Sequence, residues 1–562
     1  MIFRQRNKWN LPSPIPSEYL QQLGSYPEIL QEILFRRNIK TEQKSIDFLL
    51  PKNLDWYSSK QLLHSDKSCQ LIIEAIDSDS TIGIYGDYDA DGLTGTALVF
   101  LALSRLTDKL IPYIPNRFSE GYGLNKVAIK KLHTQGVSLL ITVDNGIGSI
   151  DEIEYANSLG IKVIVTDHHT PKEELPLAAA ILNPKVIDDT YPFKMLAGVG
   201  IAYKLVNTLS NHYPVINPDD YLDLVAIGTI ADIVPLVSEN RYISKQGLIS
   251  INQHKRQCLV SLLGAANLLG TKISSSDISF QIGPRLNAAG RLGQAENALR
   301  LLITTDPNVC GVLAQQLEND NFNRKKLGSL MEQKAQEIIL ADGPPEFLIT
   351  AFDKTFNSGV SGIVAGSLAR KYNLPVIIGQ IGAEHSVASC RSIPEFDLIG
   401  ALDRCKDLFV RYGGHPLAAG FTIKNSNVPE LEKRLRNLSE TKLRGIDLTP
   451  SLDVDVEVRL DQLDQNLINI LERIEPTGAE NKEVLFMSRD LYASNIKTVG
   501  KDKKHLKLLI TDGSYSIDAI GFGLGDQISS LPPKFDALYN FQLNEFRGKN
   551  NFQLNLIDLR PS

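Results

Sequence analysis

Short apolar runs alternate with helix-like segments in the part of the chain that begins near residue 80. Three of these runs, TIGIY at 81–85, SLLITV at 138–143 and IKVIVT at 161–166, each end in a turn that carries aspartate. A helix-like segment follows each run. Apolar strands that alternate with helices are typical of a parallel sheet covered by helices. The pattern therefore predicts an α/β domain with a parallel sheet over residues 80–305.

Helical periodicity dominates three other parts of the chain. Residues 1–79 carry leucines at helical spacing with a break at Pro51, so we expect an N-terminal helical segment that packs on the parallel-sheet domain. Residues 217–262 also have the pattern of helices. The stretch near 308–340 suits one long helix, which we expect to connect two domains over residues 306–340.

The last 220 or so residues show two further patterns. The turn-rich ADGPPEF at 341–347 precedes the apolar runs FLITAF, PVIIG and AAGFTI, which predict a second α/β domain over residues 341–445. From residue 446 to 562, apolar and polar positions alternate in LDVDVEV, HLKLLI, SIDAIGF and NFQLNLI. This alternation predicts a small antiparallel, OB-like β-barrel.

Length and composition narrow the class of protein. The 562 residues are 43% hydrophobic and 22% charged, an ordinary globular balance, and the length suits three or four domains of ~100–200 residues each. The net charge of −6 argues weakly against a nucleic-acid partner, because phosphate neutralisation favours a basic surface. Metal ions in an acidic pocket and locally basic stretches would answer that objection.

Cysteines and apolar runs bear on the compartment. The five cysteines are scattered and form no C-x-x-C pair, so we expect neither a disulfide framework nor a zinc knuckle, and a reducing compartment fits. The opening residues MIFRQRNKWNLPSP contain no apolar signal core, and no apolar run approaches the ~18–20 residues of a membrane span. We therefore expect a cytoplasmic protein without a membrane partner.

Acidic and histidine residues follow each of the three apolar runs of the parallel-sheet domain. Taken singly, each cluster has an ordinary interpretation as an acidic turn, a helix cap or a histidine satisfied in the core. The carboxyl ends of parallel strands meet at one edge of a sheet, so the three clusters can converge there. Convergence favours a metal site. The residues concerned are Asp87, Asp89, Asp91, Asp144, Asp167, His168 and His169.

A fourth element is Asp232, which follows the apolar stretch LDLVAIGTIA. A buried carboxylate is costly unless it is paired, and a cation would pair it; the alternative is a helix cap before IVPL. Carboxylates with one or two imidazoles suit Mn²⁺ or Mg²⁺ better than structural zinc. Two such ions about 3.5–4 Å apart would support hydrolysis of a phosphodiester.

These motifs together resemble the DHH phosphoesterase superfamily, which is named after the Asp-His-His triplet found here at 167–169. DYDADG at 87–92, VDNGI at 143–147 and GTIAD at 228–232 are similar to its other motifs. Within that superfamily the chain resembles the RecJ family through FSEGYGL at 118–124, GPRLNAAGR at 283–291 and RYGGHPLAAGF at 411–421. The resemblance covers nearly the whole chain. It implies a DHH domain, a DHHA1 domain and an OB-like nucleic-acid-binding domain.

The resemblance implies a centre that binds two divalent ions, Mn²⁺ or Mg²⁺. Asp144 would bridge the ions and Asp89 would complete the second site, with Asp87 close by. His169 would lie behind the ligands or near the scissile phosphate. The first ion would be held by Asp91, Asp144, His168 and Asp232.

The family also implies an activity and partners. The activity is stepwise 5′-to-3′ release of mononucleotides from single-stranded DNA, in DNA repair and recombination, by a monomer. Single-strand-binding protein and a helicase are family-based expectations as partners. Neither the polarity nor the preference for DNA over RNA follows from the spacing of residues.

Two positions depart from the family pattern. Some DHH relatives have a histidine four residues before the first ligating aspartate, where this chain has Tyr85, so we expect the second ion to have one ligand fewer. RecJ proteins commonly show Trp-His where this chain has Phe356 and Asn357, which removes the role of that histidine.

Substrate-handling residues are expected in four places. Arginine offers a bidentate fork for phosphate, and glycines let backbone N–H groups approach one. The alternatives are solvated arginines in a surface loop at GPRLNAAGR and a hairpin turn at Gly-Gly-His. The residues concerned are Arg117, Arg285, Asn287, Arg291, Ser389, Arg391, Gly413, Gly414 and His415.

The predicted barrel contains the basic stretch KTVGKDKKHLK at 497–507, with Lys501, Lys503 and Lys504 near its centre. Three aromatic residues lie in the same domain, Phe522, Phe535 and Tyr539. Basic and aromatic groups together fit a groove for single-stranded nucleic acid, in which aromatic rings stack on bases. The alternative is a solvated hairpin.

Three functions compete. The first is the single-strand-specific exonuclease. The second is a DHH phosphoesterase on short oligonucleotides or small nucleotides, whose members are shorter and lack the barrel. The third is a non-catalytic DNA-binding scaffold, which predicts eroded ligands, whereas all the proposed ligands are present. Degradation of long single strands against dinucleotides, with manganese and with chelator, separates them.

Overall fold

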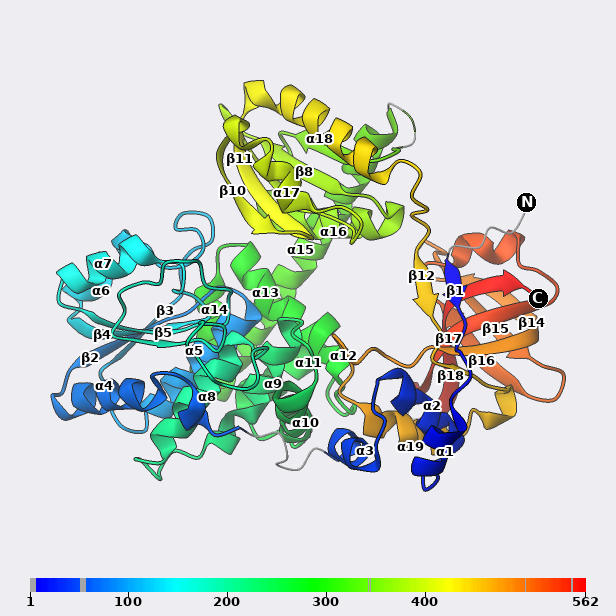
Figure 1. Ribbon diagram of the computed structural model, residues 1–562, viewed down its shortest axis with the longest axis horizontal. Coiled ribbons are helices and arrows are strands. Elements are labelled where there is room, and N and C mark those ends of the chain that lie inside the picture. Colours follow the sequence, from blue (N-terminus) through cyan, green and yellow to red (C-terminus); the bar gives the residue numbers. More distant parts are fainter. Residues whose placement is uncertain (1–6, 51–56, 342, 344, 501, 547–548) are drawn as a thin grey trace. The chain divides into compact units, whose positions relative to one another are not determined.

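A computed structural model describes residues 7–50, 57–341, 343, 345–500, 502–546 and 549–562 (Figure 1). The chain divides into two compact units. The first comprises residues 1–287, 295–314 and 451–562, and the second comprises residues 288–294 and 315–450. Within the described residues no helix is both long enough and apolar enough to cross a bilayer.

A five-stranded parallel sheet organises the first part of unit one. Its strands are β2 (Thr81–Tyr85), β3 (Leu110–Tyr113), β4 (Val137–Val143), β5 (Lys162–Thr166) and β6 (Ala180–Leu182). The strand order is β3-β2-β4-β5-β6, and every pair is parallel. The direction of winding therefore reverses between β2 and β4. In sheets of this kind the crevice outside the carboxyl ends at the reversal point is where ligands bind.

Helices cover both faces of this sheet, because its strand residues are apolar on both sides. In Figure 1, α6 (Lys126–Thr134) and α7 (Ile150–Ser158) lie above the sheet, and α4 (Ser65–Asp77) and α8 (Gly198–Ser210) lie below it. Ile164 faces one layer with α4, α5 (Ala90–Leu103) and α8, whereas Val163 and Val165 face the other. The predicted parallel α/β domain is confirmed.

Further helices complete this part, in agreement with the helical pattern of residues 217–262: α9 (Leu222–Ala231), α10 (Ser238–Asn252), α11 (Gln257–Ala265), α12 (Ser275–Asp277), α13 (Gly283–Arg291) and α14 (Ala295–Ile303). A π-helical turn spans Ile278–Ile282. The long helix expected near 308–340 is α15 (Pro307–Ala341). The interpretation of GPRLNAAGR as a loop is wrong: this segment forms the helix α13, which continues directly from the π-helical turn.

The N-terminal helices do not all pack where we expected. Only α4 packs on the parallel sheet. The helices α1 (Ser17–Gln22), α2 (Glu28–Arg36) and α3 (Glu42–Leu49) instead bury Leu23, Leu30, Ile33 and Leu34 in one cluster with the C-terminal residues 456–559. The strand β1 (Lys8–Asn10) likewise pairs with β12 (Ser451–Asp453). Helical periodicity identifies the apolar face of a helix but not the surface that covers it.

The second unit contains a five-stranded mixed sheet in the order β10-β11-β9-β8-β7. Its strands are β7 (Ile349–Asp353), β8 (Val376–Ile381), β9 (His385–Arg391), β10 (Phe409–His415) and β11 (Ala418–Lys424). Three helices accompany it: α16 (Ser358–Tyr372), α17 (Leu398–Asp403) and α18 (Val428–Leu443). The prediction of a second α/β domain is confirmed.

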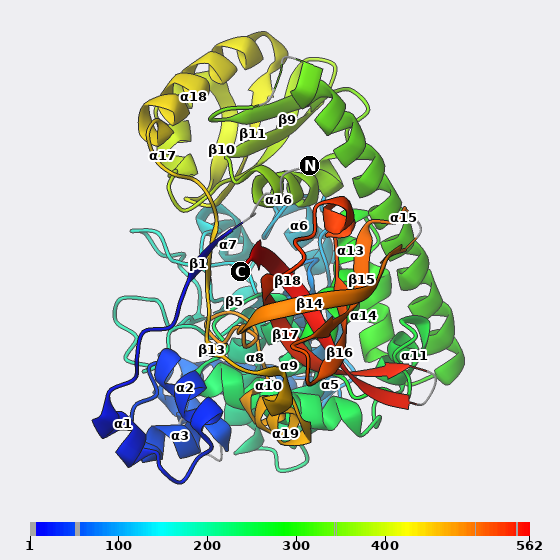
Figure 2. The same cartoon turned by 90° about the vertical axis from the view of Figure 1, so that its right-hand side faces the viewer.

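The C-terminal strands close into a barrel, whose strands β14 to β18 face the viewer in Figure 2. They are β14 (Phe486–Val499), β15 (His505–Thr511), β16 (Ser516–Gly521), β17 (Phe535–Phe546) and β18 (Lys549–Pro561). Closure comes from the pairing of β14 with β17. The short strand β13 (Val456–Glu457) and the helix α19 (Gln465–Ile474) precede the barrel. The predicted OB-like barrel is confirmed.

Candidate metal centre

The first acidic cluster lies between β2 and α5 and forms the start of that helix. Asp89 is the N-cap: its Oδ1 accepts hydrogen bonds from the backbone N–H groups of Asp91 and Gly92 at 3.0 and 3.1 Å. The N–H of Ala90 donates to Oδ1 of Asn287 at 2.7 Å. N-cap bonds of this kind are worth about 0.5–2 kcal/mol. They fix the acidic loop directly after the strand.

The first turn of α8 holds the carboxylate of Asp91. Oδ2 accepts the N–H of Gly198 and Oδ1 accepts the N–H of Val199, both at 2.7 Å. The amino end of a helix stabilises a negative charge placed there. Gly198 is required for this approach, because a Cβ at that position would lie 2.6 Å from Cβ of Asp144. One helix end therefore positions two acidic residues.

Asp144 follows β4 in a strained conformation. Its φ of +63° lies in the left-handed region that non-glycine residues rarely adopt. The turn is held by its N–H, which donates to the carbonyl of Thr166 at 2.9 Å. Nδ2 of Asn145 donates to the carbonyls of Val143 at 2.8 Å and Tyr85 at 3.3 Å. Strain that the surroundings enforce in this way clusters at functional sites.

The three residues of the Asp-His-His triplet have different roles. Asp167 does not face the acidic cluster: its Oδ2 accepts the N–H of Ile147 at 2.9 Å, and its Oδ1 lies 2.8 Å from Nδ1 of His169. Asp167 thus orients His169, whose side chain is 41% exposed. His168 is buried. The triplet therefore offers one buried and one accessible imidazole.

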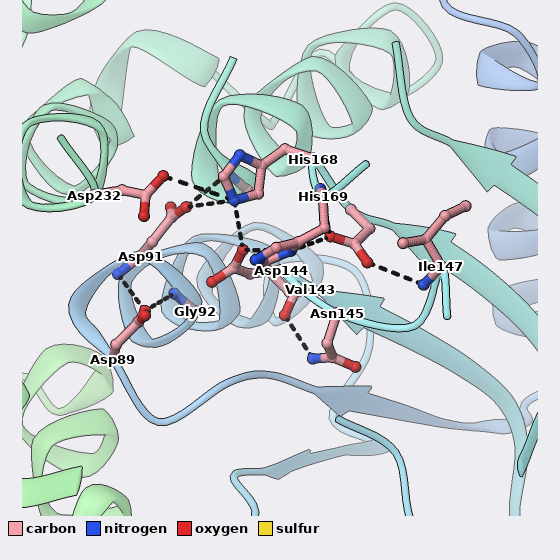
Figure 3. Close-up of polar contacts among 12 residues, drawn as sticks. Asp89, Asp91, Gly92, Val143, Asp144, Asn145, Ile147, His168, His169 and Asp232 are labelled. Atoms are coloured by element: carbon pink, nitrogen blue, oxygen red, sulfur yellow. Dashed lines mark hydrogen bonds and ion pairs between the residues drawn. The ribbon is translucent and has the colours of Figure 1, made fainter. Parts of the chain in front are cut away.

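His168 lies at the centre of the cluster (Figure 3). Its Nε2 is 3.1 Å from Oδ1 of Asp144, 3.6 Å from Oδ2 of Asp232 and 3.9 Å from Oδ2 of Asp91. Asp232 reaches this point as the C-cap of α9, not as the N-cap of a following helix. The structure therefore brings the four sequence motifs together at one edge of the sheet.

Burial and mutual repulsion shift the pKa values of these groups. Burial, reinforced by neighbouring carboxylates, raises the pKa of Asp91 to about 7 and that of Asp232 to about 9. The same causes raise the pKa values of Asp87 and Asp144 well above the usual range. Burial, with the nearby His169, lowers the pKa of His168 to about 3. These carboxylates cannot all carry charge without a compensating cation.

The accessible histidine shows the opposite behaviour. Burial alone would lower the pKa of His169, but the hydrogen bond and charge of Asp167 raise it. Correspondingly, burial would raise the pKa of Asp167, but bonds from His169 and from the N–H of Ile147 lower it. The pair therefore favours the protonated form of His169 and the neutral form of His168.

The donor atoms fit a divalent cation. The buried Oδ1 atoms of Asp87 and Asp144 accept no hydrogen bond. Among the described residues, three groups place one ligand atom from each member within 4.8 Å of the others. Carboxylate oxygens with a neutral imidazole are ligands that suit Mn²⁺ and Mg²⁺. The groups are Asp91, His168 and Asp232; Asp87, Asp89 and Asp144; and Asp144, His168 and His169.

Tyr85 is turned away from the centre. Its hydroxyl donates to the carbonyl of Gly123 at 3.0 Å and accepts from Nδ2 of Asn125 at 3.1 Å, and its ring stacks on Tyr113 with centroids 5.2 Å apart. The side chain is buried on the opposite side of β2 from Ile84. It therefore supplies no ligand to the second group of carboxylates.

Three residues near the centre were not singled out from the sequence. The hydroxyl of Tyr122 donates to the carbonyl of Asp144 at 3.3 Å and lies 3.2 Å from Nδ1 of His169. Nδ2 of Asn183 donates to the carbonyl of His169 at 2.8 Å. The charge of Lys185 lowers the pKa of Asp232. Only Tyr122 had a usable signal, its place within FSEGYGL.

The residues expected to handle substrate in the first unit make different contacts. Arg117 lies over the ring of Tyr88, 5.1 Å from its centroid, and its charge lowers the pKa of Asp87. Arg285 is buried, and its Nη1 donates to the carbonyl of Gln281 at 2.8 Å. Asn287 holds the acidic loop, as described. Of these residues, Arg117 is the one whose charge acts on the acidic cluster.

The corresponding residues of the second unit lie at the end of α13 and on strands of its sheet. Nη1 of Arg291 donates to the carbonyl of Gly359 at 3.2 Å. The guanidinium of Arg391, on β9, lies against Gly362 of α16, 3.1 Å from where a Cβ would be. Ser389 is its neighbour on β9. The exposed residues Gly413, Gly414 and His415 end β10 and pair with β11, so they belong to a hairpin.

Phe356 and Asn357 have structural contacts in this chain. Phe356 is buried in the core beside α16. Asn357 is the N-cap of α16, and its Oδ1 accepts the N–H of Gly359 at 2.8 Å. The residues that depart from the family pattern therefore start a helix.

The basic stretch lies at the hairpin between β14 and β15. Lys503 and Lys504 are exposed, and Lys504 forms an ion pair of 3.0 Å with Asp502. Lys501 lies outside the described residues. Of the three aromatics, Phe522 is exposed and makes an edge contact with His505, but Phe535 and Tyr539 are fully buried in the barrel core. The expectation that these two stack on bases is therefore wrong.

Comparison with known proteins matches three successive family models to the chain. Residues 81–229 match the DHH family N-terminal domain, residues 345–441 match the DHHA1 domain, and residues 454–558 match the RecJ OB domain. The first match includes Asp87, Asp89, Asp91, Asp144, His168 and His169 and ends three residues before Asp232.

Individual proteins are similar over nearly the full length. The single-stranded-DNA-specific exonuclease RecJ of Bacillus subtilis is 35% identical over 100% of this chain and 72% of its own length. RecJ of Haemophilus influenzae is 33% identical over 94% of this chain and 95% of its own length. A crystal structure of Thermus thermophilus RecJ in complex with Mn²⁺ matches 99% of this chain and 80% of its own, with 28% identity and a TM-score of 0.85. A structure of the same protein with Mg²⁺ also matches, at 28% identity and a TM-score of 0.79 over 99% of this chain and 79% of its own.

Proposed function

Because the chain belongs to the RecJ family of single-stranded-DNA-specific exonucleases, we propose that its Asp-His cluster is a two-metal centre that hydrolyses single-stranded DNA from its 5′ end. The protein is a single-stranded-DNA-specific exonuclease, a hydrolase of phosphodiester bonds. The observation that carries the proposed centre is the convergence of three strand ends and α9 on His168. The barrel and the intact ligand set disfavour a small-nucleotide phosphoesterase and a non-catalytic scaffold.

The donor groups support an assignment of two ion sites. We assign Asp91, His168 and Asp232 to the first ion, and Asp87 and Asp89 to the second, with Asp144 shared. Bound divalent ions, Mn²⁺ or Mg²⁺, would activate water and neutralise charge on the phosphodiester. Asp91 and Asp144 are held in place by α8 and by the strained turn after β4, so the donors are pre-organised.

His169 is assigned to the scissile phosphate. Its Nδ1 is engaged by Asp167, and its side chain is accessible, so its other ring nitrogen is available to donate a proton to a phosphate oxygen. The hydrogen bond and charge of Asp167 raise the pKa of His169, which favours the protonated ring. Tyr122, 3.2 Å from the ring, limits its rotation.

The finer assignments complete the proposal. The exonuclease would release mononucleotides in the 5′-to-3′ direction, act as a monomer in the cytoplasm, and serve DNA repair and recombination. Single-strand-binding protein and a helicase would deliver its substrate. Arg117, Arg291, Ser389, Arg391 and the Gly413–His415 hairpin would contact the DNA backbone, and the exposed Lys503 and Lys504 would guide the strand. The buried Arg285 would support α13 from within.

Degradation assays test this function directly. Substrates are a long single strand labelled at either end, the same sequence as a duplex, and a dinucleotide, each with Mn²⁺, with Mg²⁺ and with chelator. We expect mononucleotides from the single strand only, beginning at the 5′ end, and no product with chelator. Preferential cleavage of the dinucleotide, or release that begins at the 3′ end, would contradict the proposal.

Unequal metal affinity is a first prediction. Asp89 is only half-buried, and it has no imidazole beside it, because Tyr85 faces away. We therefore expect titration calorimetry with Mn²⁺ to show two sites, the one containing Asp89 being weaker. In the Asp89→Asn variant only the weak step should disappear. Two sites of equal affinity would contradict this assignment.

Charge reversal in the barrel is a second prediction. Lys503→Glu with Lys504→Glu removes two exposed positive charges far in sequence from the metal ligands. Each lost phosphate contact lowers the slope of log affinity against log salt by about 0.7 for a single strand. We expect weaker binding of long single strands and a slope lower by about one.

The matched control for that prediction is Lys433→Glu with Lys442→Glu, two exposed lysines on α18. It changes net charge equally but should leave the slope unchanged. An equal loss of affinity in both double variants would mean that overall charge, and not the barrel hairpin, attracts the strand.

A further inference from the structure

Ile233, the residue after Asp232, has an unusual backbone. Its φ is +61°. Glycine adopts the left-handed conformation freely, and asparagine and aspartate adopt it at a small cost. The conformation is disfavoured for all other residues, most of all for β-branched residues such as isoleucine. Among the described residues, the other left-handed non-glycine positions are all polar. Ile233 is therefore the one aliphatic residue that the described chain keeps in this conformation.

The packing of Ile233 does not explain its identity. The side chain is 74% exposed, so it contributes little to the core. Glycine or asparagine is the usual choice directly after a helix C-cap, because either adopts the left-handed conformation at less cost. An exposed isoleucine at this position therefore lowers stability without compensation from its own contacts.

Its location suggests what the side chain does. The turn is anchored at one end by the N–H of Ile233, which donates to the carbonyl of Ile230 at 3.3 Å, and at the other by the N–H of Leu236, which donates to the carbonyl of Ala479 at 2.8 Å. The residue before it, Asp232, has its carboxylate 3.6 Å from Nε2 of His168. An exposed apolar residue thus directly follows a proposed metal ligand, in a turn that is anchored at both ends.

The other groups around the centre are suited to charge. Carboxylates and imidazoles can hold metal, and Lys185 and Arg117 can face phosphate oxygens. The ring of Tyr122 is an aromatic surface at the centre, edge-on to His169 with centroids 5.7 Å apart, and Ile233 offers an exposed aliphatic one. An exonuclease that removes any nucleotide needs a contact that every base can make, and apolar contact with a base face meets that requirement.

We propose that Ile233 makes an apolar contact with the nucleobase next to the phosphodiester that is cleaved. This inference rests on the proposed exonuclease function. The strained backbone is the cost of holding an apolar side chain at this position. Ile233 would then contact the substrate and determine how tightly any nucleotide is held.

Two substitutions separate the contact from the strain. Ile233→Ala shortens the side chain and keeps a Cβ in the left-handed conformation, whereas Ile233→Gly removes both the side chain and the strain. Loss of apolar contact worth about two methylene groups predicts a KM for single-stranded DNA about tenfold higher in both variants, with kcat nearly unchanged. The apparent Tm should be equal to or above the wild-type value for Ile233→Gly.

An abasic substrate identifies the partner of the side chain. Single strands carry one abasic residue at the 5′ or the 3′ terminus, and KM is compared with that of the intact strand. If Ile233 contacts the base, the KM of the wild type should be about tenfold higher on the strand whose abasic residue lies at the end that is cleaved. On that strand the KM of the two variants should be no higher than that of the wild type. Ile187→Ala, which removes another exposed isoleucine, 93% exposed, is the matched control and should change nothing.

Three results would overturn the inference. They are an unchanged KM in both variants, an effect of the substitutions on KM that is equally large on abasic and intact strands, and a clear fall in the Tm of Ile233→Gly. Wild-type activity on the intact strand is read first. Its absence would count against the exonuclease function itself, independently of Ile233.

Discussion

Replacing Asp144 by asparagine is expected to lower the rate of hydrolysis by about a thousandfold or more while the protein stays folded. The size follows from the loss of a central group in a metal-assisted reaction, where single catalytic groups contribute about 10²–10⁴-fold. Asp144 belongs to two of the three donor groups and lies 3.1 Å from His168. Asparagine keeps the shape of the side chain and tolerates the left-handed backbone, so the change is confined to charge.

The same variant should be more stable than the wild type when metal is removed. Burial and the neighbouring carboxylates raise the pKa of Asp144, so its charged form opposes folding in the absence of a cation. We expect a higher apparent Tm in chelator for Asp144→Asn and a smaller rise in Tm on addition of Mn²⁺. Asp108→Asn, at an exposed position before β3, is the control and should alter neither activity nor the response to metal. More than about a tenth of the wild-type rate in Asp144→Asn would falsify the shared-ligand role, given the ~10²–10⁴ scale above.

Most of the metal centre could be predicted from the sequence because its residues are tied to strand ends. Asp144 and the Asp-His-His triplet directly follow apolar runs, and parallel strands carry whatever follows them to one edge. Asp232 was identified differently, as a charge at the end of an apolar helix that needed a partner. Both arguments depend only on local sequence, so they can be made without knowledge of the tertiary structure.

The supporting residues could not be predicted in the same way. Asn287 supports the acidic loop from a distance of 197 positions along the chain, and nothing in its surroundings marks it as a partner of Ala90. Gly198 is required only because α8 begins against Asp144. Tyr122 reaches His169 from a loop. Such contacts arise from tertiary packing, which periodicity does not encode.

The packing of the N-terminal helices also could not be predicted from periodicity, and it determines which experiment can test the barrel. Because α1–α3 share their core with residues 456–559, a chain that ends near residue 445 would expose Leu23, Leu30, Ile33 and Leu34. Truncation would therefore lower stability and DNA binding together. Point changes in the exposed hairpin at Lys503 and Lys504 separate the two effects, as truncation cannot.

Replacement of Arg241 is expected to have the second large effect, a loss of folding stability. The side chain is 2% exposed, and its guanidinium donates to five backbone carbonyls, at 2.8 to 3.3 Å. Four of the carbonyls belong to the end of α19 and the residues after it, and one belongs to α3. They are those of Phe48, Arg473, Ile474, Glu475 and Pro476.

Arg241 therefore fastens three segments that are remote in sequence. The last carbonyls of a helix have no partners within it, and a cation at that end also offsets the helix dipole. Burial lowers the pKa of Arg241, to about 9, but leaves it charged at neutral pH. Its ring contact with Phe48, 3.8 Å from the centroid, holds the guanidinium plane in place.

Replacing Arg241 by methionine should cost about 3–4 kcal/mol of stability, because bonds from a charged donor contribute about 1.5–3 kcal/mol each and do not add fully. Hydrogen exchange should accelerate in α3 and α19 before it does so in β2, β4 and β5. Arg459→Met, whose side chain is 74% exposed and pairs only with Asp461 among the ion pairs of the described residues, is the matched control and should cost little.

The two readouts distinguish a fastening role from a catalytic one. If Arg241 joins α10 to α3 and α19, cleavage of a short oligonucleotide below the unfolding temperature should stay within about twofold of wild type, because the metal ligands lie on other elements. Binding of long single strands should weaken, because the barrel that α19 precedes is no longer held to the sheet domain. Faster exchange spread evenly over the parallel sheet would instead show that Arg241 supports the whole unit, and the assignment of a local joint would then be wrong.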